Sequence, residues 1–97
     1  MKTTLDIYKE LKSQRNDIWE IAVKMSMYNS IGTFVDNPTD EEYKIISDVC
    51  YRAYMKAEKV DFIRLCDRVS EEYSLGDITL EELKEMTAWQ LLDKFEC

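Results

Sequence analysis

The chain has 97 residues, of which 45% are hydrophobic and 34% charged, and its formal net charge is −7. This length and composition are typical of one globular domain, which we expect to span residues 1–97. No apolar run approaches the roughly 18 residues of a membrane-spanning helix. The first twenty residues carry four acidic side chains and no apolar stretch, so we expect a cytoplasmic protein with neither a membrane anchor nor a secretory signal. The negative charge has the wrong sign for direct binding to nucleic acid.

Low glycine and proline usage indicates the fold class. The chain has two glycines and one proline, too few for the closely spaced turns of a small β-sandwich or barrel. We therefore expect an all-α fold, namely a small single-domain bundle of three to four antiparallel helices. A domain of this size buries only about 60–65% of the surface of its unfolded chain, so formation of a homodimer would add stability.

The first third of the chain predicts one long helix. Thr3 can cap its start, with Asp6 as the acidic partner three residues later. Apolar side chains then recur at helical intervals, at Ile7, Tyr8, Leu11, Ile18, Ala22 and Met25. We expect this helix to end at Asn29, Ser30 and Gly32, and residues 33–38 to form the longest connector. Met27, Tyr28 and Ile31 lie beyond the stripe, and we expect them to form an exposed patch for an oligomer contact or a partner.

The middle of the chain has the clearest helix start. Thr39 and Glu42 form a T-x-x-E capping box directly after Pro38. Two apolar stripes follow, one from Tyr43 to Ala57 and one from Phe62 to Tyr73, and they are out of phase by about one residue, or about 100° around a helix. We therefore favour a break near residues 58–61, with Asp61 as a new cap. A single helix over residues 40–73 is the alternative.

The last helix is expected to follow the turn at residues 74–77, in which Gly76 suits the left-handed position after a helix end. Thr79 caps this helix and Glu82 completes its capping box, while Ile78 can pack against Leu83. One broad apolar face continues to the end of the chain, through Leu80, Leu83, Ala88, Leu91, Leu92 and Phe95. Met86 and Trp89 lie on the other side.

The residues that usually carry chemistry are missing. Without histidine the chain lacks the commonest general base and metal ligand, and no glycine-rich phosphate loop occurs. The stretch 36–42 has some acidic character but lacks the central glycine and the spacing of a calcium loop. The three cysteines predict free thiols rather than a disulfide framework or a zinc site, at Cys50, Cys66 and Cys97. We therefore expect no catalytic residue, no metal and no cofactor, and a protein that is not an enzyme.

Negative charge is concentrated toward the end of the chain. Residues 71–97 hold eight acidic side chains against two lysines. Carboxylates three or four residues apart on a helix stand about 5–6 Å from one another, close to the spacing of successive phosphates on a nucleic-acid strand. We predict a surface that binds a protein partner with a basic surface. The candidate partner-binding residues are Glu71, Glu72, Asp77, Glu81, Glu82, Glu85, Met86 and Trp89.

Three functions are compatible with these features. The first is an inhibitor that occludes a basic, nucleic-acid-binding partner. In its short, acidic and helical profile the chain resembles small inhibitors from phages and mobile elements, including some anti-CRISPR proteins and DNA mimics, although this likeness is one of profile and transfers no site residue. The second is a homo-oligomeric helical module with a structural or scaffolding role. The third is a small-ligand protein that binds or sequesters a nucleotide, with Tyr51 or Tyr54 stacking on the base.

Overall fold

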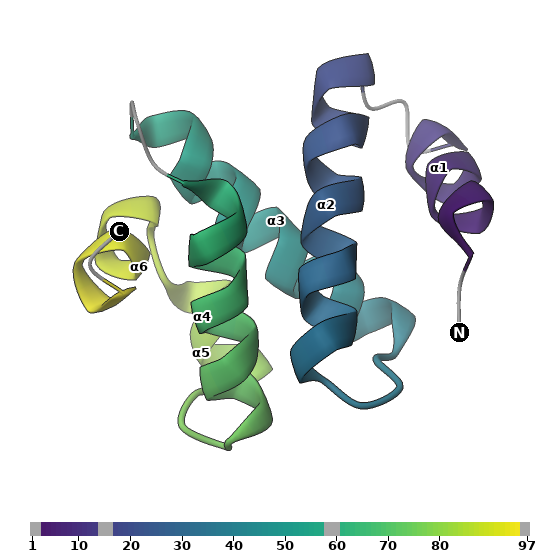
Figure 1. Ribbon diagram of the computed structural model, residues 1–97. Helices are drawn as coiled ribbons and strands as arrows, with labels where there is room; N and C mark the ends of the chain where they lie inside the picture. Colours follow the sequence, from purple (N-terminus) through teal and green to yellow (C-terminus); the bar gives the residue numbers. More distant parts are fainter. Residues whose placement is uncertain (1–2, 14–16, 58–60, 96–97) are drawn as a thin grey trace.

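The computed structural model describes residues 3–13, 17–57 and 61–95 (Figure 1). The helices are α1 (Thr4–Ser13), α2 (Ile18–Phe34), α3 (Asp40–Lys56), α4 (Phe62–Ser74), α5 (Leu80–Glu85) and α6 (Ala88–Phe95). Over these three ranges no strand occurs, so the all-α class is confirmed. The expected number of three to four helices is wrong, because the first and last expected helices are each divided in two.

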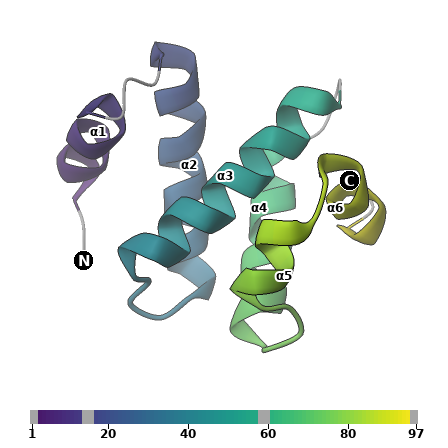
Figure 2. The ribbon, with the colours of Figure 1, turned by 180° about the vertical axis from the view of Figure 1, so that it is seen from behind.

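The helices pack in two layers with a helix on each flank. α2 and α4 run side by side, and α3 crosses behind both (Figures 1 and 2). α1 packs on the outer flank of α2, while α6 packs against α3 and α4 on the opposite flank, and α5 packs on α3. All six helices contribute to the buried core, with side chains such as Leu11, Met27, Ile46, Leu65, Leu83 and Phe95 that are at most 1% exposed.

The long helix expected over the first third of the chain is two helices, α1 and α2. A D-x-x-E sequence supplies the second start, because the Asp17 side chain accepts a hydrogen bond of 2.7 Å from the backbone N–H of Glu20. α2 also ends later than expected, at Phe34, so Asn29, Ser30 and Gly32 lie within it. Burial explains this extension, since Ser30 is 7% exposed and Ile31 is completely buried.

This division changes which face of α2 is buried. The periodicity of α1 places Ile7 and Leu11 in the core as expected, but it does not continue into α2, where Ile18 is 84% exposed and Ala22 is also exposed. The expected exposed patch is therefore wrong: Met27, Tyr28 and Ile31 are at most 2% exposed. They point toward the core formed with α3 and α4, where the Cys66 thiol lies 3.5 Å from the carbonyl oxygen of Met27.

The expected break in the middle of the chain is confirmed, and a single helix over residues 40–73 is wrong. α3 ends at Lys56, and α4 begins after Asp61, whose carboxylate accepts hydrogen bonds of 3.1 Å from the backbone N–H groups of Ile63 and Arg64. Residues 58–60 lie outside the described part of the chain. Because α3 and α4 run in different directions, both out-of-phase stripes face the same core. The free thiols of Cys50 and Cys66 are buried within this core. Cys97 lies outside the described residues.

The turn after α4 forms as predicted, whereas the last helix does not. Gly76 has a φ of +82°, and the bonds from Gly76 N–H to Tyr73 and from Asp77 N–H to Glu72 form a Schellman motif. The Thr79–Glu82 capping box is present, but α5 ends at Glu85 and a second helix starts at Ala88. Thr87 and Gln90 form the corresponding reciprocal pair for α6, with bonds of 2.9 and 3.1 Å.

Among the residues described, no helix has both the length and the apolar character that crossing a membrane requires.

Candidate functional site: an acidic end

Two connections that are distant in sequence lie at the same end of the molecule. The connector between α2 and α3 and the turn between α4 and α5 both lie at the lower end in Figures 1 and 2. We call this region, residues 35–43 and 71–86, the acidic end. It contains ten acidic residues and one basic residue, Lys84, so the fold joins two acidic segments into one surface.

The structure places the predicted partner-binding carboxylates on the outside of this region. Glu71, Asp77, Glu81 and Glu85 are exposed, and Glu82 is exposed although its carboxylate caps α5. Glu72 is half-buried. Trp89, in the first turn of α6, is 60% exposed, whereas Met86 is half-buried against the core. A partner can therefore reach the exposed members of the predicted set, whereas the Met86 side chain packs against the core and does not project into solvent.

One groove of about 600 Å³ lies between the connector and the turn, and we call it the connector groove. Its apolar lining comes from Val35, Ile78 and Leu80, and its carboxylates are Asp36, Glu42 and Glu81. A second groove of about 460 Å³, the α5–α6 groove, lies on the other side of α5. It is lined by Ile78, Glu82, Glu85, Met86, Gln90 and Lys94. Ile78 borders both grooves, which together carry five carboxylates and one ammonium group among the described residues.

Glu42 and Tyr73 join the two segments of the acidic end. One oxygen of the Glu42 carboxylate accepts the Thr39 N–H at 2.8 Å, and the other accepts the Tyr73 hydroxyl at 2.5 Å. Burial raises the pKa of Glu42, but these bonds and the Thr39 side chain outweigh it, so the net pKa is lowered. Burial, together with the Glu42 hydrogen bond and charge, raises the pKa of Tyr73 to about 12. At neutral pH the groove wall therefore holds a carboxylate and a neutral phenol.

Lys84 neutralises only part of this surface. Its ammonium nitrogen lies 3.5 Å from Glu41 and 3.6 Å from Glu81, and all three side chains are well exposed. Ion pairs of this kind contribute at most about 1 kcal/mol and are readily exchanged. Glu81, a carboxylate of the connector groove, consequently remains available to an incoming cation.

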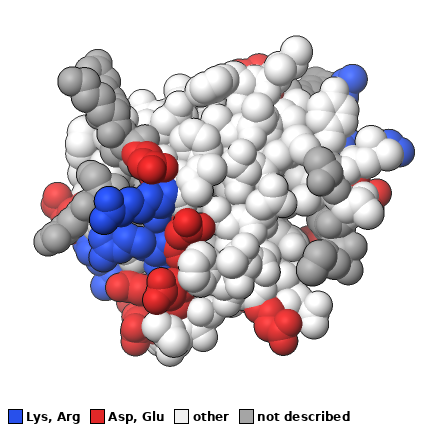
Figure 3. Space-filling model, viewed as in Figure 1, with Lys and Arg blue, Asp and Glu red and all other residues white. Residues whose placement is uncertain are grey.

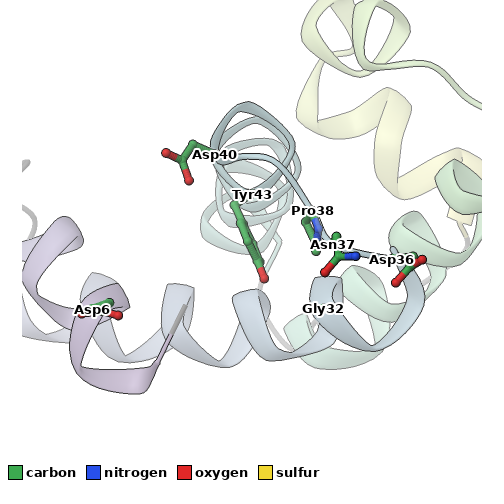
Figure 4. A pocket seen from close by; sticks show the side chains of 7 residues that line it. All are labelled: Asp6, Gly32, Asp36, Asn37, Pro38, Asp40 and Tyr43. Carbon is green, nitrogen blue, oxygen red and sulfur yellow. The ribbon is translucent and has the colours of Figure 1, made fainter. Parts of the chain in front are cut away.

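A pocket of about 390 Å³ lies on the other side of the connector (Figure 4). Its carboxylates are Asp6 from α1, Asp36 from the connector and Asp40 from α3, and Asp36 borders the connector groove as well. The Tyr43 ring stacks on Tyr28 at 4.7 Å, and a Cβ atom at Gly32 would stand 3.5 Å from the Tyr43 hydroxyl. Within the ranges that the structure describes, no group of three or more His, Cys, Asp or Glu side chains is arranged to hold a metal ion.

Asp36 and Glu42 are the site residues that sequence reasoning missed. The acids at the start of α3 have an obvious local role, since they oppose the positive end of the helix dipole. Only the packing of α3 against α5 brings these acids close to the turn between α4 and α5. Tyr51 and Tyr54, the predicted nucleotide platform, line none of the cavities described above. Their rings pack with each other at 6.2 Å, and Tyr54 meets the edge of Phe62 at 5.0 Å.

No protein-family model, no curated protein and no solved structure matched this chain. Geometry and charge at the acidic end are therefore the basis for the functional proposal.

Proposed function

We propose that this protein binds a basic surface of another protein through the acidic end, and that it acts as an inhibitor by occupying a surface that the partner uses for nucleic acid. The observation that carries the proposal is the pair of grooves around Ile78, with five carboxylates, one ammonium group and an apolar floor. Such a groove accepts the aliphatic stem of a Lys or Arg side chain on the floor and its charged head at the rim.

Trp89 supports the same interpretation. It is 60% exposed next to Gln90, which lines the α5–α6 groove. Exposed tryptophan is enriched at binding hot spots, and its ring can stack on an arginine guanidinium. An acidic surface together with an exposed tryptophan suits a protein partner better than it suits free nucleic acid, which would be repelled.

The proposal is tested with a short Lys/Arg-rich peptide as the probe and the variant Asp36→Asn/Glu81→Gln/Glu85→Gln. The matched control is Glu10→Gln/Asp67→Asn/Asp93→Asn, which removes three charges outside the acidic end. In a Trp19→Phe background, the emission of Trp89 reports binding. We expect the acidic-end variant to weaken binding by about tenfold or more, and the control to have a much smaller effect. Equal loss in both variants would show that net charge alone attracts the peptide and would contradict the proposal.

Inhibition is tested separately by competition. Duplex DNA bound to the same peptide should be released by the wild-type protein and by the control variant, but not by the acidic-end variant. Both peptide binding and DNA release should weaken as salt rises, because the attraction is between exposed charges. Release that is indifferent to the three acidic-end substitutions would remove the inhibitory part of the proposal.

A further inference from the structure

The exposed side of α2 carries no charged residue, unlike that of an ordinary surface helix. A surface helix normally presents its charged residues to water. α2 contains two charged residues, Glu20 and Lys24, and both are drawn toward α3. Lys24 is 7% exposed and its ammonium lies 2.8 Å from Asp48 of α3 and 3.3 Å from Glu20. The outer side of α2 therefore carries no charge, in a chain whose residues are 34% charged.

The residues on this outer side form a continuous strip, which we call the uncharged face. It consists of Ile18, Trp19, Ala22, Ser26, Asn29 and Thr33 on α2, together with Ile63 on α4. Ile18 is 84%, Trp19 58% and Ile63 41% exposed. Figure 3 shows that the middle of this side of the molecule is free of charged side chains among the residues drawn in colour, and that basic and acidic groups gather at its margins.

Two polar side chains of the strip, Ser26 and Thr33, form hydrogen bonds within α2. The Ser26 hydroxyl donates to the carbonyl of Ala22 at 3.3 Å, and the Thr33 hydroxyl donates to that of Asn29 at 2.9 Å. Because these hydroxyls are satisfied within their own helix, covering them leaves no unpaired donor. Ala22 and Ser26 are also small, so a second helix can approach α2 closely. A shallow groove of about 390 Å³ between α2 and α4 adjoins the strip, with Asp67 at its edge.

We infer that the uncharged face is a self-association surface, on which a second copy of this chain packs with its α2 antiparallel to the first. A two-fold axis places a face against itself, so a charge near the axis meets an identical charge; none of the seven residues of the uncharged face is charged. The antiparallel orientation follows from the charge distribution. α2 leads into the acidic end at Phe34, so an antiparallel pair keeps the two acidic ends apart, whereas a parallel pair would set them side by side.

A basic partner is a poor occupant of this face, because the face offers no carboxylate to pair with it. The dimer instead leaves both acidic ends free, one at each extremity. Self-association through this face is independent of the proposed function. Its affinity should change with salt in the opposite direction to that of peptide binding. Two bodies that each carry a charge of −7 repel one another, so screening by salt should tighten the dimer while it weakens binding of a basic peptide.

Sedimentation equilibrium of the full chain tests the inference, with Ala22→Glu as the disruptive variant and Met55→Glu as the control. Met55 is 59% exposed on α3, a helix that contributes no residue to the uncharged face. We expect a concentration-dependent dimer for the wild type and for Met55→Glu, and at least about 100-fold weaker association for Ala22→Glu, because each copy would bury a carboxylate without a partner in the interface. Ala22 is exposed, so the variant should keep its helical content, which circular dichroism checks.

A second readout does not depend on the variant. In a Trp89→Phe background, the emission of Trp19 should shift to shorter wavelength as the protein is concentrated, and this shift should occur at lower concentration when salt is raised. A wild type that stays monomeric from low micromolar to submillimolar concentration would overturn the inference, as would a dimer that Ala22→Glu leaves intact. Neither result would bear on peptide binding at the acidic end.

Discussion

The Tyr73 hydroxyl donates a hydrogen bond of 2.5 Å to the carboxylate of Glu42, and this contact links the end of α4 to the first turn of α3. The same carboxylate closes the capping box with Thr39. One glutamate therefore stabilises a helix start and fixes the relative position of two segments that are 31 residues apart. These two segments form the walls of the connector groove, so the geometry of the candidate site depends on this bond.

Removal of the hydroxyl tests this role. Tyr73→Phe should lower the free energy of unfolding by about 1–2 kcal/mol, since a hydrogen bond to a charged group is worth more than a neutral one. Urea denaturation measures the change. Tyr8→Phe is the control, because it removes a hydroxyl from a ring that is 38% exposed on α1, and it should change stability by a few tenths of a kcal/mol at most. Equal effects of the two substitutions would contradict a structural role for the bond.

The raised pKa of Tyr73 predicts a loss of stability at alkaline pH. Its pKa is about 12 in the folded protein against 10.0 for an unperturbed tyrosine, so the protonated phenol stabilises the fold. This contribution is complete below pH 10 and is lost as the pH rises from 10 toward 12. Tyr73→Phe should show a smaller decline over that interval when urea midpoints are measured. Some decline should persist, because burial and the charges of Glu20 and Asp17 also raise the pKa of Tyr51. Parallel curves for wild type and variant would be inconsistent with this assignment.

Lys24 is buried and depends on its carboxylate partners. The Asp48→Ala variant would leave the buried ammonium with one carboxylate, Glu20, instead of two, so it should cost about 1–3 kcal/mol of stability. The double variant Lys24→Met/Asp48→Ala should recover part of that loss, because an apolar side chain of similar length replaces an uncompensated charge in the same space. A double-mutant cycle by urea denaturation measures the coupling between the two residues. Strict additivity of the two substitutions would show that the 2.8 Å contact contributes nothing.

Helix starts could be predicted from the sequence where a capping residue precedes a new apolar stripe. Thr39, Asp61 and Thr79 cap the helices that they were expected to cap. Asp17 and Thr87 show the same signal, D-x-x-E and T-x-x-Q, but apolar residues recur at helical intervals on both sides of each, and this spacing suggested an uninterrupted helix. The apolar pattern was therefore given too much weight against local capping chemistry, and the number of helices was underestimated.

The candidate site was only half predictable for a different reason. Its C-terminal carboxylates form one acidic segment, which composition alone reveals. Asp36 and Glu42 join them only through the packing of α3 on α5 and the Tyr73 hydrogen bond, and these long-range contacts leave no local mark in the sequence. The wrong placement of Met27 has another cause. The buried face of α2 could not be predicted while α1 and α2 were treated as one continuous helix.

Thr87→Ala tests the second of the missed helix starts. Loss of the Thr87 side chain removes the acceptor for the Gln90 N–H, and we expect a cost of about 1 kcal/mol. Hydrogen exchange should show faster exchange in the first turn of α6 than in the wild type. Thr33→Ala is a matched control inside α2, where the Thr33 hydroxyl donates to the carbonyl oxygen of Asn29 in the same helix. Because alanine is the better helix former, the stability of this variant should be unchanged or slightly higher. A larger loss at Thr33 than at Thr87 would argue against a cap at Thr87.

Met27→Ala distinguishes a core position from a surface patch. The side chain is completely buried where α2 meets the core, so its truncation should cost about 2–5 kcal/mol by removing apolar contacts and leaving a cavity. Met55→Ala is the matched control, since Met55 is 59% exposed and the same atoms are lost there with little change in burial. Urea denaturation of the two variants compares them directly. If both methionines tolerated alanine equally, Met27 would have to be exposed, and the phase of α2 that also defines its uncharged outer face would be wrong.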